Sequence, residues 1–126
     1  MAEELLVGPD IETGRLFVDQ LIREGFPLKA AAWVYESENQ RWRLYLVAPI
    51  RNRDLLDFYL RASQAALADP DRKEDFKLVS FTIVDSRQPL GRRLVGWAKS
   101  TKRDYRKISD SAEGQLISAV VYGAAA

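Results

Sequence analysis

The sequence predicts an α+β fold, with an antiparallel or mixed sheet of about five strands and three helices in the order αββαβαββ. Segments with the period of a strand occur mainly as adjacent pairs around a short turn, which is typical of antiparallel hairpins. Segments with the period of a helix separate these pairs. The 126 residues are 47% apolar and 29% charged, without a repeat or a linker, which predicts a single domain over residues 1–126.

The first helix is predicted to begin at Asp10, because aspartate caps helix N-termini. Its apolar residues recur at the spacing of one helix face: Phe17, Val18, Leu21 and Ile22. We expect Gly25 to end the helix in the left-handed conformation, and Pro27 to prevent its continuation.

A hairpin is predicted next, with strands at about 29–36 and 41–48. If Glu36 faces Arg41, alternation brings six residues to one face of the sheet: Ala31, Trp33, Tyr35, Trp42, Leu44 and Leu46. This face carries no charge, so we expect its two Trp and two Leu to be buried beneath the first two helices. The other face carries Ala30, Ala32, Val34, Arg43, Tyr45 and Val47.

The second helix is predicted from near Asn52 to near Ala68, with these side chains toward the sheet: Leu55, Leu56, Tyr59, Leu60, Ala62, Ala66 and Leu67. Residues 76–84 predict a strand with Val79, Phe81 and Ile83 on one face. Pro89 marks the start of a third helix with an apolar stripe at Leu90, Leu94, Trp97 and Ala98. Two short final strands are expected at about 106–109 and 116–122.

Cysteine and histidine are both absent. Their absence excludes disulfides, thiolate nucleophiles, Ser-His-Asp triads and imidazole bases, so we predict no catalytic residue and no cofactor. The chain starts with acidic residues rather than with a secretory signal, and no apolar run approaches the roughly 20 residues of a membrane span. We therefore expect a cytoplasmic protein with no membrane partner.

Charge is distributed unevenly along the chain. Residues 1–86 hold 11 Lys/Arg and 15 Asp/Glu, whereas residues 87–126 hold 8 Lys/Arg and 3 Asp/Glu. All eight of these cations lie between Arg87 and Lys107, and Tyr105 lies among them, where it could stack on a base. Seven form the candidate site for nucleic acid or another phosphate-bearing polyanion: Arg92, Arg93, Lys99, Lys102, Arg103, Arg106 and Lys107.

The alternative explanation of this segment is a solvated helix face and a charged loop. The acidic excess of residues 1–86 could then compensate the cations. Internal compensation predicts ion pairs from these cations to Asp or Glu, whereas a polyanion site predicts unpaired cations on one face.

Carboxylates and aromatic rings supply two further candidates. Residues 69–75 and Asp85 could hold magnesium in a metal-dependent enzyme, but the cluster contains Pro70, Arg72 and Lys73 and matches no calcium loop, so we predict no metal site. The aromatic residues of the first hairpin could stack on a ligand, but their alternation favours core packing.

Several segments together resemble a group of small bacterial proteins with no assigned function. They are DIETGR at 10–15, WVY at 33–35, WRL at 42–44 and AP at 48–49, followed by the helix that begins PL at 89–90. The resemblance covers most of the chain. The shared residues are of structural types, so the resemblance implies a bacterial cytoplasmic source and transfers no active residue.

Three functions stay open on the sequence alone. The first is a non-enzymatic binding or interaction module, the second a nucleic-acid-associated protein that uses residues 87–107, and the third a metal-dependent enzyme. We also predict a homodimer, because the second hairpin face would expose a large apolar patch unless a second copy covers it. The competing outcome is that a helix of the same chain covers this face.

Overall fold

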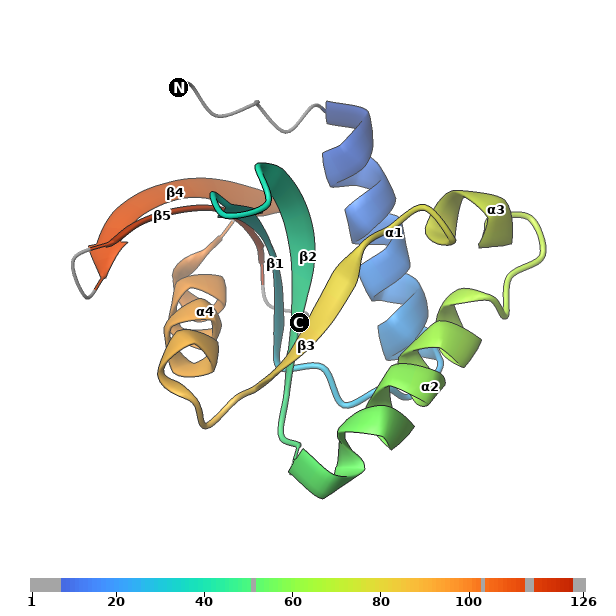
Figure 1. Cartoon of the computed structure of the whole chain (residues 1–126). Coiled ribbons are helices and arrows are strands. Elements are labelled where there is room, and N and C mark those ends of the chain that lie inside the picture. The colour runs from blue at the N-terminus through green and yellow to red at the C-terminus, as the bar shows by residue number, and fades with distance from the viewer. Residues whose placement is uncertain (1–7, 51, 103, 113–114, 124–126) are drawn as a thin grey trace.

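A five-stranded mixed sheet in the order β3-β2-β1-β5-β4 organises the fold, which confirms the predicted α+β class. The computed structural model describes residues 8–50, 52–102, 104–112 and 115–123 (Figure 1). The elements are α1 (Gly8–Arg23), β1 (Ala30–Glu36), β2 (Arg41–Ala48), the 3-10 turn η1 (Asn52–Asp54), α2 (Leu55–Ala66), α3 (Lys73–Phe76), β3 (Phe81–Asp85), α4 (Pro89–Ser100), β4 (Tyr105–Ala112) and β5 (Gln115–Tyr122). The short helix α3 adds to the predicted order.

The connections place helices on both faces of the sheet. β2 and β3 are parallel, and the other described neighbours are antiparallel. The crossover from β2 to β3 carries α2 and α3, which lie with α1 on one side of the sheet (Figure 1). The chain then passes from β3 to the opposite edge through α4, which lies on the other side (Figure 1). No helix in the described ranges combines the length and the apolar character that a membrane span needs.

α1 begins at Gly8 rather than at Asp10, and it ends as Gly25 predicts. Gly25 has a φ of 85°. Its N–H donates to the carbonyl of Ile22 at 3.0 Å, and the N–H of Phe26 donates to the carbonyl of Leu21 at 2.9 Å. These two bonds form a Schellman motif, which satisfies carbonyls at the end of the helix. Phe26 is thereby turned into the core, where it is buried.

The predicted register of the first hairpin is confirmed: Glu36 faces Arg41 and Trp33 faces Leu44. Trp33 and Leu44 are buried in a core that also contains residues of α1 and α2. Trp42 was predicted to be buried and is half-buried instead. It lies at the end of the hairpin, where its ring centroid is 5.5 Å from that of Tyr35.

α4 of the same chain covers the other face of the hairpin. Pro89 occupies the start of α4 as predicted, and Leu94 and Ala98 are buried in a second core. This core includes the hairpin residues Ala30, Ala32, Val34 and Val47, with Tyr45 packed against it. The apolar patch that motivated the homodimer prediction is therefore covered within the chain, which gives three layers.

The predicted inner face of the second helix is confirmed for Leu55, Tyr59, Ala62 and Ala66, which are buried or pack against the first core, and wrong for Leu56, Leu60 and Leu67, which are exposed. α2 buries Ala62, Ala65 and Ala66, whereas Leu56 is 72% and Leu60 is 53% exposed. The short alanine side chains permit a close approach to α1. At this contact, Nε2 of the buried Gln20 of α1 donates to the carbonyl of Ala65 at 3.3 Å.

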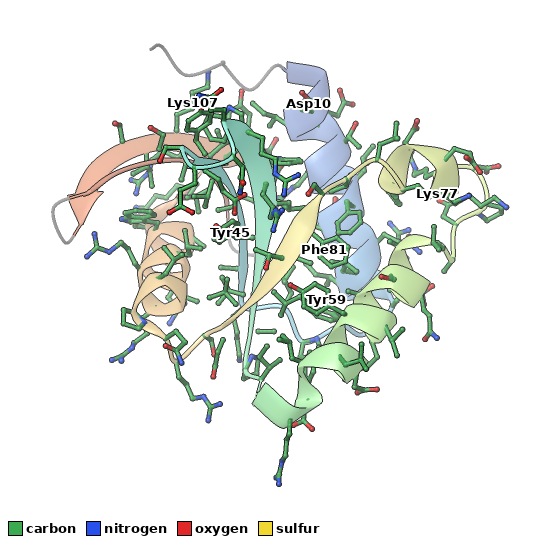
Figure 2. The ribbon with its side chains drawn as sticks, viewed as in Figure 1. Asp10, Tyr45, Tyr59, Lys77, Phe81 and Lys107 are labelled. Atoms are coloured by element: carbon green, nitrogen blue, oxygen red, sulfur yellow. The ribbon has the colours of Figure 1, made fainter. Side chains whose placement is uncertain are left out.

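β3 starts at Phe81 rather than at residue 76, because the residues before it form α3 and a turn. Phe76 of α3 is buried and meets Phe17 of α1 edge-on, with ring centroids 5.4 Å apart. Phe81 and Ile83 face the core of α1 and α2, as predicted. Figure 2 shows Tyr59 and Phe81 on this side of the sheet and Tyr45 on the side of α4.

The final hairpin is longer than predicted and leaves β4 at an edge of the sheet. Tyr105 faces Tyr122 and Lys107 faces Val120 in its register. Alternation puts Tyr105 and Lys107 on the α1 side of β4, with Arg106 and Ile108 on the α4 side. Ile108 packs against the second core, so it anchors the strand.

Candidate nucleic-acid interface

Arg87, the first cation of the basic segment, is part of the fold. Its Nη2 lies 2.9 Å from Oδ2 of Asp85 and its Nε lies 3.1 Å from Oδ1. The same Nη2 donates to the carbonyl of Ile50 at 2.7 Å. These bonds connect the start of α4 to the end of β3 and to the segment after β2. They also lower the pKa of the Asp85 carboxyl below its ordinary value.

Arg92 and Arg93 lie in the first half of α4, away from the end of the helix. Arg92 is roughly 12 Å along the helix axis from Ser100, at 1.5 Å for each residue. Its Nε donates to the carbonyl of Arg87 at 3.0 Å. The guanidinium of Arg93 lies 6.0 Å from the centroid of the Trp97 ring. The structure therefore does not bring these two predicted residues together with the cations that follow α4.

A hollow of about 640 Å³ opens where α4 ends and β4 begins. We call it the basic hollow, and its lining holds three of the predicted site residues: Lys102, Arg106 and Lys107, together with Ser100, Thr101, Asp104 and Tyr105. Lys99 is exposed on the last turn of α4, and Arg103 lies outside the described residues. Lys107 lies beside β4 in Figure 2, on the part of the molecule remote from α2.

The lysines of this region have no acidic partner within the described chain. Lys99, Lys102 and Lys107 form no ion pair with a described residue, and Arg106 donates to the neutral Ser100 hydroxyl at 3.1 Å. The acids that do form ion pairs have partners elsewhere: Asp19, Glu36, Asp69, Glu74 and Asp85. Internal compensation predicted ion pairs here, and the described residues of the hollow do not show them.

The C-terminal end of α4 is satisfied by neutral groups. Helix C-termini carry partial negative charge and commonly recruit Lys or Arg. Here the hydroxyls of Ser100 and Thr101 both donate to the carbonyl of Trp97, at 3.0 and 2.7 Å. The N–H of Thr101 donates to the carbonyl of Ala98 at 3.2 Å. The neighbouring cations are therefore not required to satisfy these carbonyls.

A second hollow, of about 370 Å³, adjoins the first and was missed by sequence reasoning. We call it the α1 hollow, and its lining comes from three elements and the segment before β4: Ile11, Glu12, Arg15, Asp104, Tyr105 and Tyr122. Tyr105 and Asp104 line both hollows. Because its residues are far apart in the sequence, Tyr105 within the basic segment was the one signal that pointed to it.

The acidic cluster at residues 69–75 is an exposed turn. Asp69 accepts a hydrogen bond from the N–H of Asp71 at 2.9 Å and lies 3.8 Å from Nε of Arg72. Glu74 lies 3.2 Å from Nζ of Lys77. Across the described ranges, no group of three or more carboxylates is arranged so that it could hold a metal ion.

Glu36 gathers several groups at the end of the first hairpin. Its carboxylate lies 3.7 Å from Nε of Arg41 and 3.5 Å from Nε of Arg43, and it accepts a 2.7 Å hydrogen bond from the Tyr45 hydroxyl. Burial and this hydrogen bond raise the pKa of Tyr45 to about 12. Glu36 thus provides a counter-charge for Arg43 beside the second core, so we interpret this cluster as structural.

Comparisons with known proteins identify no relative from which a function could be transferred to the site. A scan against models of protein families, a search of curated proteins and a search of solved structures each find no match to this chain.

Proposed function

We propose that this chain is a non-enzymatic, single-domain binding module whose basic hollow binds the phosphate backbone of nucleic acid. The observation that carries the proposal is the grouping of Lys102, Arg106 and Lys107 around one hollow without an ion pair to a described acid. Phosphates recruit such groups through charge and through hydrogen bonds. A bacterial cytoplasmic setting, as the sequence predicts, provides this ligand.

The grouping, rather than the lack of partners alone, distinguishes this region. Lys29 and Lys73 are also exposed and form no ion pair with a described residue, but neither lines the basic hollow. Among the described lining residues, the three cations outnumber the one carboxylate, Asp104. Clustered cations raise the local concentration of a polyanion, and Arg106 and Lys107, which lie on opposite faces of the edge strand β4, would contact it from the two sides of that edge.

The test is a titration of fluorescently labelled single- and double-stranded oligonucleotides, followed by anisotropy at low and moderate salt. We expect binding that weakens as salt rises, with a slope of about −2 in log K against log salt for single strands, if about three phosphates are neutralised. The Lys102→Glu/Lys107→Glu variant is expected to lose at least about tenfold in affinity and to show a smaller slope.

The matched control is Lys29→Glu/Lys73→Glu, which makes the same change of charge away from the hollow. At moderate salt, about 0.1 M, it is expected to bind within about threefold of wild type, because surface charges beyond the Debye length of about 10 Å are then largely screened. Absence of binding at low salt, or an equal loss in the two variants, would refute the proposal. Circular dichroism spectra and melting curves establish that both variants are folded.

We further infer that this chain forms a homodimer through α2 rather than through the hairpin face. Leu56 and Leu60 form an exposed apolar stripe on α2. Arg53, Asp57 and Arg61 alternate in sign at intervals of four residues beside it, without ion pairs to described residues. In an antiparallel two-fold pair, Asp57 of each copy would meet an arginine of the other.

Light scattering tests this assembly at tens of micromolar protein. The expected result is a dimer that becomes a monomer in Leu56→Glu/Leu60→Glu. A monomeric wild type, or a dimer that persists in the variant, contradicts it.

A further inference from the structure

Tyr105 lines both hollows. Its side chain is 41% exposed at the start of the edge strand β4. It contributes to the basic hollow together with Lys102, Arg106 and Lys107, and to the α1 hollow together with Ile11 and Tyr122. An exposed tyrosine beside clustered cations is the arrangement with which proteins stack an unpaired base while they hold its phosphate.

The α1 hollow has a chemistry different from that of its neighbour. Its floor contains the buried side chains of Ile11 and Tyr122. The guanidinium of Arg15 lies 5.7 Å from the centroid of the Tyr122 ring, so it is stacked against the floor. An apolar floor with polar groups at the rim is typical of sites for flat organic groups, and about 370 Å³ lies at the small end of their range of roughly 300–1,000 Å³.

Two carboxylates at the rim give the α1 hollow a preference. Glu12 and Asp104 are exposed and form no ion pair with a described residue. Ionised carboxylates only accept hydrogen bonds, so they favour a base that presents an amino group, such as cytosine or adenine. Thymine presents a single imino N–H flanked by two carbonyl oxygens, and the carboxylates would repel these oxygens.

We infer that the α1 hollow receives one unpaired, amino-bearing base of a single-stranded nucleic acid, which stacks on Tyr105 while the adjacent phosphates enter the basic hollow. This inference rests on the proposed function and deepens it, because it names the form of the nucleic acid and the class of base. A base within a duplex is stacked on its neighbours and cannot enter the hollow.

The experiment compares oligo(dC), oligo(dA), oligo(dT) and a duplex of equal length, by anisotropy at low salt, with wild type, Tyr105→Leu, Tyr105→Phe and Glu12→Gln. Wild type is expected to bind oligo(dC) and oligo(dA) more tightly than oligo(dT) and the duplex. Tyr105→Leu is expected to weaken single-strand binding about tenfold, the effect of one base stack, with duplex binding unchanged. Tyr105→Phe keeps the aromatic face and is expected to retain wild-type affinity.

Glu12→Gln tests the preference among bases. It is expected to bring the ratio of the oligo(dC) and oligo(dT) affinities toward one, because the amide both donates and accepts. Equal binding of all single strands by wild type, or single-strand affinity unchanged in Tyr105→Leu, overturns the inference.

The two proposals fail in different ways. If Lys102→Glu/Lys107→Glu abolishes binding but Tyr105→Leu has no effect, the basic hollow binds phosphates and the inference about the base is wrong. If wild type binds no oligonucleotide at low salt, both are wrong. Circular dichroism of each Tyr105 variant controls for folding, and the exposed position of this side chain predicts little change.

Discussion

The substitution Tyr122→Phe tests how α1 is held on the sheet. The Tyr122 hydroxyl accepts a 2.8 Å hydrogen bond from Nε1 of Trp33 and donates a short hydrogen bond to the carbonyl of Ile11 in α1. The hydroxyl oxygen of Tyr122 thus joins β1, β5 and α1. Burial raises the pKa of Tyr122, which keeps this hydroxyl protonated and able to donate.

The magnitude follows from the burial of the partners. Tyr122 is 2% and Trp33 is 6% exposed, so water cannot replace the lost bonds. A buried group left unpaired costs about 1–3 kcal/mol, so two such groups predict a loss of about 2–4 kcal/mol in the free energy of unfolding after some relaxation. For a domain of this size, each kcal/mol lowers the melting temperature by roughly 3–6 °C.

Gly14 provides an independent check of the same contact. A Cβ atom at this position would lie 2.6 Å from Nε1 of Trp33 and closer still to the Tyr122 hydroxyl. Gly14→Ala is therefore expected to destabilise the wild type, and to cost less in Tyr122→Phe, where the nearest atom is gone. The assay is urea unfolding of the two single variants and the double variant. Gly96→Ala is the control, since its Cβ meets nothing within 4 Å.

The outcome that would refute this reasoning is additivity. If the free-energy changes of Gly14→Ala and Tyr122→Phe add within about 0.3–0.5 kcal/mol, the two positions do not interact as the structure indicates. A loss below about 0.5 kcal/mol in Tyr122→Phe would likewise show that the hydroxyl is not a buried link between α1 and the sheet.

Three further predictions concern stability. Arg87 lowers the pKa of the Asp85 carboxyl, so this pair stabilises the fold fully above pH 3.8, the ordinary pKa of aspartate. This contribution is lost as the pH falls through the lower pKa of the folded state. In urea unfolding at acid pH, Asp85→Asn should lack this dependence of the midpoint on pH. The pKa of Tyr45 is raised from 10.0 to about 12, so the protonated hydroxyl contributes stability that is complete below pH 10.0 and is lost as the pH rises through 12. The free energy of unfolding of Tyr45→Phe should not show this loss at alkaline pH. Gly91→Ala should lower the melting temperature, since its Cβ would collide with the carbonyl of Asp85, whereas Gly96→Ala should not.

The parts of the fold that the sequence predicted well are those with strong local signals. The register of the first hairpin follows from period-two alternation, because a shift by one residue would put Arg43 among the buried residues of the first core. Gly25 and Pro89 marked helix ends because each has a backbone preference that other residues lack. Such signals operate within a few residues and need no knowledge of the tertiary neighbours.

The errors arose where tertiary packing outweighed local pattern. The predicted inner face of α2 included Leu56 and Leu60 as well as Ala62, but the helix packs closely through its alanines, so these two leucines are exposed. The segment before β3 has apolar residues at strand spacing, yet Phe76 belongs to a short helix that packs on Phe17. Period alone does not show which of two apolar stripes a neighbouring helix will contact.

The candidate site was predictable in its charge and not in its shape. The clustering of cations is visible in the sequence, but the different structural roles of these cations are not. Arg87 forms an ion pair within the fold, Arg92 lies in the first half of α4, and Lys102 and Lys107 line one hollow. Glu12 and Arg15 join the site only because α1 lies beside the end of β5. This juxtaposition depends on the order of strands in the sheet, which no local pattern encodes.

The cations of the basic hollow lie outside the packing that stabilises the fold. Two explanations of these cations, phosphate binding and protection of the sheet edge, can therefore be tested by replacing them. Charged side chains on an edge strand also prevent strands of different copies from pairing. Lys102 and Lys107 are exposed, whereas Ile108 anchors β4, so their replacement by Glu is expected to change the free energy of unfolding by no more than about 0.5 kcal/mol. Glutamate protects an edge as well as lysine does. If protection were their whole role, Lys102→Glu/Lys107→Glu would keep the oligonucleotide affinity and salt slope of wild type, whereas phosphate binding requires that both decrease.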